Sequence, residues 1–138
     1  MANNFHLEIV TPYRMFYDDD AEMVIVKTIT GEMGILNEHM PSVVPLDIGI
    51  LRIKANGKIQ SASTAGGFVT IGTDKTTIIT DCAEWADEID VNRAENALER
   101  AQQRLDKRNE KIDIARAELA IKKAFNRIKL VEESGKKK

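Results

Sequence analysis

The distribution of glycine, proline and threonine constrains the fold of this chain most. These residues recur throughout the first 80 positions. After Thr80 the sequence contains no proline, no threonine and a single glycine, Gly135. Short apolar runs between turn residues are typical of strands, whereas a long stretch without glycine or proline is typical of helices. The composition changes sharply between residues 85 and 90, so the sequence predicts two parts with different secondary structure.

The first part, residues 1–86, reads as a series of short strands. Ala55–Lys58, Gly66–Gly67 and Gly72–Asp74 supply glycine or asparagine for turns between apolar runs. Many short strands at regular spacing favour an antiparallel sandwich or barrel over a parallel sheet. The predicted strands are Phe5–Val10, Ala21–Ile29, Met33–Leu36, Ile48–Ile53, Ile59–Ala65, Phe68–Ile71 and Thr76–Thr80.

The second part, residues 87–133, reads as two helices. Asp90 is a suitable N-cap, and apolar residues then recur every three or four positions as far as Leu105. A polar stretch, Asp106–Lys111, is predicted to hold the turn, after which Ile114 opens a second run with the same spacing. Small and branched residues on both apolar seams favour an antiparallel hairpin. Residues 134–138 are expected to form a disordered basic tail.

The bulk composition excludes several classes of function. Hydrophobic residues make up 43% and charged residues 30%, as in globular proteins, and the net charge of -2 does not favour nucleic-acid binding. No apolar run approaches the roughly 20 residues that span a bilayer, and no secretory signal is visible. Cys82 is the single cysteine. We therefore expect a cytoplasmic protein that meets a membrane only through its partners.

The sequence offers no recognisable active site. It contains no glycine-rich phosphate-binding loop that ends in lysine, and its one cysteine and two histidines form no pattern of metal ligands. We therefore expect neither an enzyme nor a metal site.

Basic residues occupy one sector of each predicted helix. At about 100° per residue, each sector lies about 110° from the apolar seam and is rotated from it in the same sense. Antiparallel pairing would bring both sectors to one side, where an anion would relieve their repulsion: a phosphate ligand or an acidic protein segment. Alternatively, these are ordinary solvated faces balanced by nearby glutamates. The basic residues are Arg93, Arg100 and Arg104 on the first helix, and Arg116, Lys123 and Arg127 on the second.

Several motifs, in order along the whole chain, resemble those of the epsilon subunits of bacterial rotary (F-type) ATP synthases. Five of them lie in the first part or at its junction with the second, and two lie in the second helix. The motifs are Glu22–Val24, Gly31–Leu36, His39–Pro41, Gly66–Phe68, Ile89–Ala94, Arg116–Ala120 and Asn126–Arg127.

The resemblance implies a non-catalytic subunit of the central stalk at the cytoplasmic face of the bacterial cell membrane. The N-terminal β-sandwich would bind the gamma subunit and rest on the c-ring, with Glu32 and His39 as contact residues. The hairpin would alternate between a folded form and a form extended among the catalytic alpha and beta subunits, where it inhibits ATP hydrolysis. An acidic loop of the beta subunit would face Arg116, Lys122, Lys123 and Arg127.

The resemblance also implies ATP as a regulatory ligand of the folded hairpin, with no cofactor required. Lys123 departs from the arginine of ATP-binding relatives, which keeps the charge but loses the bidentate fork. The residues carried over to the ATP site are Glu84, Ile89, Asp90, Arg93, Ala94, Arg100, Lys123 and Arg127.

Two other functions fit the residues alone. One is a free-standing nucleotide sensor, and the other is a β-sandwich adaptor with a helical arm and no ligand. Binding of ATP by the purified chain separates the first from the second.

Overall fold

The computed structural model describes residues 4–107 and 111–135, which form two compact units, Met1–Glu84 and Trp85–Lys138. The first consists of strands and the second mainly of helices. The predicted fold class, an antiparallel β-sandwich followed by a two-helix hairpin, is confirmed.

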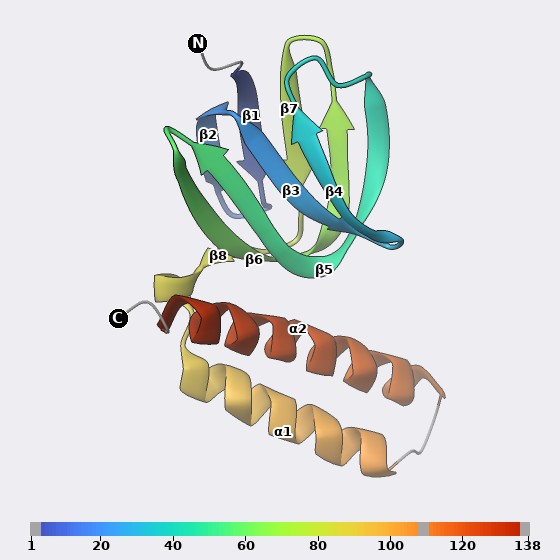
Figure 1. The fold of residues 1–138 in the computed structure, drawn as a ribbon. Helices are drawn as coiled ribbons and strands as arrows, with labels where there is room; N and C mark the ends of the chain where they lie inside the picture. Colours follow the sequence, from blue (N-terminus) through green and yellow to red (C-terminus); the bar gives the residue numbers. More distant parts are fainter. Residues whose placement is uncertain (1–3, 108–110, 136–138) are drawn as a thin grey trace. The chain divides into compact units, whose positions relative to one another are not determined.

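Eight strands form one sheet with the order β2-β1-β7-β6-β5-β3-β4, and β8 pairs with β6. The long strands β5 and β6 curve strongly in Figure 1, so that the sheet wraps around its own apolar face. The strands are β1 (Phe5–Val10), β2 (Met15–Ala21), β3 (Met23–Thr28), β4 (Gly31–Leu36), β5 (Ser42–Ala55), β6 (Lys58–Ile71), β7 (Lys75–Ile79) and β8 (Ala83–Trp85).

The core of the sandwich follows from alternation along the strands. Leu7 and Ile9 of β1 are completely buried, while the residues between and beside them are half-buried. Other strands contribute fully buried branched side chains in the same way, which is the period-2 pattern of a sheet with one apolar face. These are Val24 and Val26 of β3, Ile35 of β4, Leu51 and Ile53 of β5, Val69 of β6 and Ile78 of β7.

Strand β2 was not predicted from the sequence, because its centre is the acidic run Asp18–Asp20. It is an edge strand that pairs only with β1, and its three aspartates are exposed. Carboxylates remain solvated there, and charge on an edge opposes pairing with a further strand. The pair of β1 with β7 is parallel, whereas the pairs along the rest of the path from β2 to β4 are antiparallel.

The predicted turn at Gly66–Gly67 is wrong, since β6 continues through it as one strand of 14 residues. Both glycines have positive φ, 80° and 104°. On one side of them Phe68–Ile71 pairs with β7, and on the other the amide N–H of Ala65 donates to the carbonyl of Cys82 (3.1 Å). The glycines therefore mark the point where one edge of β6 passes from β8 to β7, while the other edge stays paired with β5 throughout.

The second unit contains the short 3-10 helix η1 (Ala86–Glu88) and the helices α1 (Val91–Lys107) and α2 (Lys111–Gly135). The two long helices lie side by side and antiparallel (Figure 1). Four alanines, one pair on each helix, are almost fully buried along the seam: Ala94 and Ala101 of α1, and Ala117 and Ala124 of α2.

Both helices are longer than the sequence predicted. Asp106, Lys107 and Lys111, assigned to the turn, are helical, and residues 108–110 lie outside the described part of the chain. Ser134 and Gly135, assigned to the tail, belong to α2, whereas residues 136–138 are not described. The polar residues at these ends include good helix formers with no proline among them, so polarity alone does not end a helix. In the described residues no helix has the length and apolar character needed to cross a bilayer.

Candidate functional site

The motif Ile89–Ala94 forms the N-terminus of α1. The carboxylate of Asp90 accepts a hydrogen bond from the amide N–H of Arg93 (3.2 Å), and its carbonyl accepts the first helical bond, from Ala94 (3.1 Å). Asp90 is therefore an N-cap that places a negative charge at the positive end of the helix dipole. Ala94 lies on the buried seam. Capping and packing thus account for two residues of the motif before any ligand is considered.

The chain enters α1 through a single turn of η1. The amide N–H of Trp85 donates to Glu88 Oε1 (2.9 Å), and that of Ile89 donates to the carbonyl of Ala86 (3.3 Å). Glu84, assigned to the ATP site, is the last residue of the first unit, while the other residues of that set belong to the second.

The predicted basic residues lie at different positions along the length of the antiparallel hairpin. The start of α1 lies beside the C-terminal half of α2 (Figure 1), which brings Arg93 and Arg127 to the open end of the hairpin. Arg104 and Arg116 belong to the opposite end, next to the connection between the helices. Arg100 and Lys123 lie between these ends.

The exposure of the basic residues differs between the helices. Arg93, Arg100 and Arg104 of α1 are all exposed. On α2, Arg116 and Lys122 are exposed, whereas Lys123 and Arg127 are half-buried. These last two are one turn apart, so their side chains lie on the same face of the helix.

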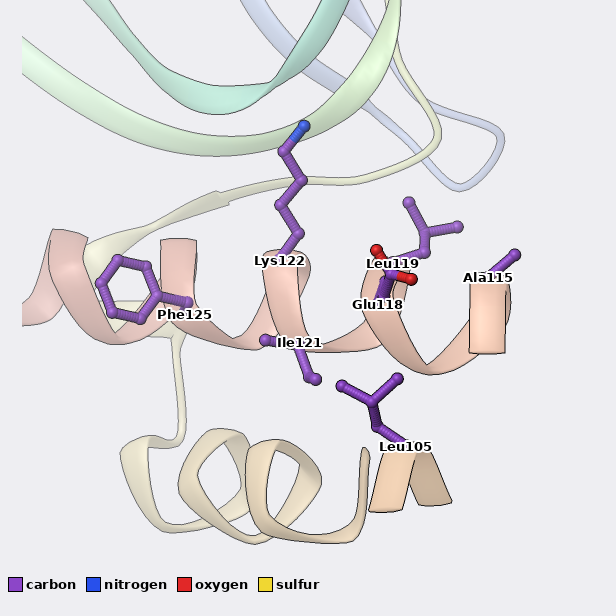
Figure 2. Close-up of a pocket in the computed structure, with 7 residues that line it drawn as sticks. All are labelled: Leu105, Ala115, Glu118, Leu119, Ile121, Lys122 and Phe125. Atoms are coloured by element: carbon purple, nitrogen blue, oxygen red, sulfur yellow. The ribbon is translucent and has the colours of Figure 1, made fainter. Parts of the chain in front are cut away.

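An open apolar groove of about 620 Å³ lies on the hairpin, lined by residues of both helices. In Figure 2, Leu105 of α1 and Ile121 of α2 point toward each other, and Lys122 points away from α1. Leu119 and Phe125, which also line the groove, are exposed, so the hairpin presents large apolar side chains at this surface. Sequence reasoning missed both residues, because they do not follow the spacing of the seam.

Glu32 lies at the beginning of β4, close to the turn between β3 and β4. It is exposed and pairs across the strands with Lys27, and Ile29 in the turn is 76% exposed. The hydroxyl of Thr28 donates to the carbonyl of Gly31 (2.7 Å) and so holds the turn closed. This end of the sandwich therefore presents an exposed carboxylate beside an exposed isoleucine.

His39 lies beyond the other end of β4, in the connection to β5. It is half-buried, and its Nδ1 lies 2.9 Å from the carbonyl oxygen of Met40. Leu36, Met40 and Val43 around it are exposed, Met40 by 78%. Sequence reasoning missed these three residues, because an apolar residue in or beside a strand reads the same whether it faces the core or the surface.

Glu32 and His39 consequently belong to different surfaces. Four residues of β4, Met33–Leu36, and the start of the following connection separate them, and an extended strand rises about 3.3 Å per residue.

Two family models match the chain in succession. The ATP synthase delta/epsilon chain β-sandwich domain matches residues 4–86, and the ATP synthase delta/epsilon chain long α-helix domain matches residues 87–132. The resemblance to bacterial epsilon subunits that the motifs indicated is thereby confirmed at the level of the family.

Bacterial relatives align with almost the whole chain. A protein of Alkaliphilus metalliredigens described as ATP synthase epsilon chain is 53% identical over 96% of this chain and 98% of its own length. One of Caldicellulosiruptor bescii with the same description is 45% identical over 94% and 95%.

A solved structure shares the fold. A chain of the mitochondrial ATP synthase of Euglena gracilis superposes with a TM-score of 0.79 over 96% of this chain and 81% of that chain, at 24% identity. Since the family models together span residues 4–132 and named bacterial relatives align nearly end to end, the chain belongs to the ATP synthase delta/epsilon chain family.

Proposed function

We propose that this chain is a non-catalytic subunit of the central stalk of a bacterial ATP synthase. It links the gamma subunit to the c-ring and inhibits ATP hydrolysis through its helical hairpin. The observation that carries the proposal is the division of the chain into two separately built units, a sandwich with exposed apolar ends and a hairpin that carries basic residues on both of its helices. The complex places the chain at the cytoplasmic face of the cell membrane, with no membrane contact of its own.

The sandwich is proposed as the docking unit. The surface formed by His39, Leu36, Met40 and Val43 combines exposed apolar side chains with a polar group, a composition suited to the core of a protein interface. We assign it to the gamma subunit. The turn that carries Glu32 and Ile29 is assigned to the polar loops of the c-ring, because it is a separate surface at the far end of β4.

The hairpin is proposed as the regulatory arm. The almost fully buried residues of its seam are alanines, and larger residues such as Leu105 and Ile121 are only half-buried. Since a buried CH₂ group contributes about 0.8 kcal/mol, the seam alone holds the two helices weakly. The groove beside Leu119 and Phe125 offers apolar surface to a larger partner. Such an arm can exchange one set of contacts for another at low cost in free energy.

Two anions are proposed to compete for the same basic residues. In the extended arm, the acidic loop of the beta subunit faces Arg116, Lys122, Lys123 and Arg127. In the folded arm, ATP binds with Arg93, Arg100, Lys123 and Arg127 around its phosphates. ATP at its Kd would stabilise the folded arm by only about 0.4 kcal/mol, and a hundredfold excess by about 2.7 kcal/mol. Regulation therefore requires a Kd well below the cellular concentration of ATP.

Reconstitution with purified gamma, alpha, beta and c subunits tests this function. The chain should copurify with the complex and lower its rate of ATP hydrolysis. The triple substitution Lys122→Ala, Lys123→Ala and Arg127→Ala should relieve inhibition while copurification persists, because it removes charge from the arm and leaves the docking unit intact.

A control removes positive charge from the sandwich instead, at the exposed residues Lys54 and Lys58, which the proposal assigns to no docking surface. That variant should inhibit like the unaltered chain. Undiminished inhibition by the hairpin variant would mean that the arm blocks by its bulk, and failure to copurify would remove the stalk assignment altogether.

A further inference from the structure

Four ionisable side chains meet on the outer face of the sheet, where β1 pairs with β2. His6 and Glu8 are two residues apart on β1 and so point to the same face, opposite to the buried Leu7 and Ile9. The antiparallel register places His6 across from Asp20 and Glu8 across from Asp18. Sequence reasoning predicted no metal site, because His6 and Glu8 on β1 are ten or more positions away from Asp18 and Asp20 on β2.

The distances in this group, which we call the β1–β2 cluster, are short. His6 Nε2 lies 2.6 Å from Asp18 Oδ1, and one donor atom from each of His6, Glu8 and Asp18 can be chosen so that all three lie within 4.8 Å of one another. The other ring nitrogen of His6, Nδ1, lies 3.3 Å from Asp20 Oδ1.

We propose that the β1–β2 cluster binds a divalent transition-metal ion of the Zn²⁺ type through His6 Nε2 and the carboxylates of Glu8 and Asp18. One imidazole nitrogen with carboxylate oxygens is a ligand set that Zn²⁺ accepts, with metal–ligand distances of about 2.0–2.2 Å. Tetrahedral ligands at that distance are about 3.4 Å apart, so small side-chain rotations would bring the three donors into place.

The contact of His6 with Asp20 fits the same assignment. A histidine that binds a metal usually donates its other ring N–H to a carboxylate, which fixes the tautomer and orients the ring. Asp20 occupies that position, and so it acts as a positioning residue.

The cluster already attracts positive charge. The carboxylates of Asp20 and Asp18 accept hydrogen bonds from the His6 ring, which raises the pKa of its imidazole above the ordinary value. Lys75 of β7 places its Nζ 3.0 Å from Glu8 Oε1, and the hydroxyl of Thr77 lies 3.5 Å from the same oxygen. On binding, the metal would replace the proton between His6 and Asp18, which passes to solvent, and would displace the Lys75 ammonium from Glu8.

Calorimetry with Zn²⁺ on the metal-free full chain tests the proposal. One ion should bind per chain, and His6→Ala and Asp18→Asn should each weaken binding at least tenfold. Asp20→Asn should weaken it by about 10- to 100-fold, the usual cost of losing an orienting carboxylate. His39→Ala, which removes the only other histidine, should leave binding unchanged.

Unlike the other substitutions, Lys75→Ala is expected to increase the affinity for Zn²⁺. Removing the competing ammonium should tighten Zn²⁺ binding, which a general loss of structure cannot do. Circular dichroism of each variant checks that the sandwich is folded. Absence of binding at millimolar Zn²⁺, binding that persists in His6→Ala, or weaker binding in Lys75→Ala would overturn the proposal.

Discussion

At the scale of single residues, the Gly66–Gly67 pair shows how one motif can serve the fold alone. Gly67 has a φ of 104°, and a Cβ built there would overlap with the carbonyl oxygen of Ile79. Only glycine accommodates both the backbone conformation and the close approach of the neighbouring strand. The close approach of the end of β7 to Gly67 therefore explains the motif without any partner or ligand.

Gly67→Ala should lower the free energy of unfolding by more than about 3 kcal/mol, since backbone strain of about 1–3 kcal/mol adds to the overlap. Gly57→Ala is the matched control: its φ of 73° is also positive, but a Cβ there would meet nothing within 4 Å. It should cost only about 1–2 kcal/mol. Urea denaturation followed by circular dichroism measures both, and equal losses would contradict the close approach at Gly67.

At the scale of elements, the charged residues of β2 and those of the hairpin lie in different surroundings. The aspartates of β2 lie on an edge strand in solvent, where they protect the sheet from further pairing. The basic residues of α1 and α2 flank an alanine seam and are spread along the hairpin. Of the set proposed for ATP, Arg93 and Arg127 lie toward the open end, and Arg100 and Lys123 lie nearer the middle.

Arg93→Ala and Arg127→Ala should each weaken ATP binding to the full chain at least tenfold, because a hydrogen bond to a charged group contributes about 1.5–3 kcal/mol. Lys123→Arg should strengthen it by restoring the bidentate fork. Isothermal titration calorimetry measures all three. Arg104→Ala, an equal loss of charge at the other end of the hairpin, should have little effect.

The absence of heat at millimolar ATP would remove the sensor role and leave the coupling role in place. An equal loss in Arg104→Ala would indicate a general effect of charge rather than a defined site.

At the scale of the whole molecule, each unit has its own apolar interior. The sandwich is filled by side chains from β1 to β7, and all of its completely buried residues precede Glu84. The hairpin is held by the alanine seam between α1 and α2. The two units can therefore carry different tasks, docking and regulation, within one short chain.

A chain that ends at Ala86 should remain folded, because it keeps every strand and the whole core of the sandwich. It should unfold cooperatively in urea, bind gamma as the full chain does and no longer inhibit ATP hydrolysis. Circular dichroism, copurification and a hydrolysis assay measure these properties, with the full chain as the reference. Loss of structure in the shortened chain would contradict the independence of the two units.

The sequence by itself determined the fold class, the two helices and most of the strands, because these depend on local periodicity and on where glycine and proline fall. It also identified the cap at Asp90 and the alanine seam that begins at Ala94. Local patterns failed where a contact distant in sequence decides the structure. They placed a turn in β6, where pairing with β5 along its whole length continues the strand, and they overlooked the acidic strand β2.

Only the tertiary structure decided which apolar residues are exposed and which charged residues meet. In the sequence, Met40 and Val43 cannot be told from core residues. In the structure, both are exposed. His6 and Asp18 come together through the register of β1 and β2. The physical reason is that secondary structure follows from interactions within a few residues, whereas a surface or a binding cluster depends on pairing between distant strands.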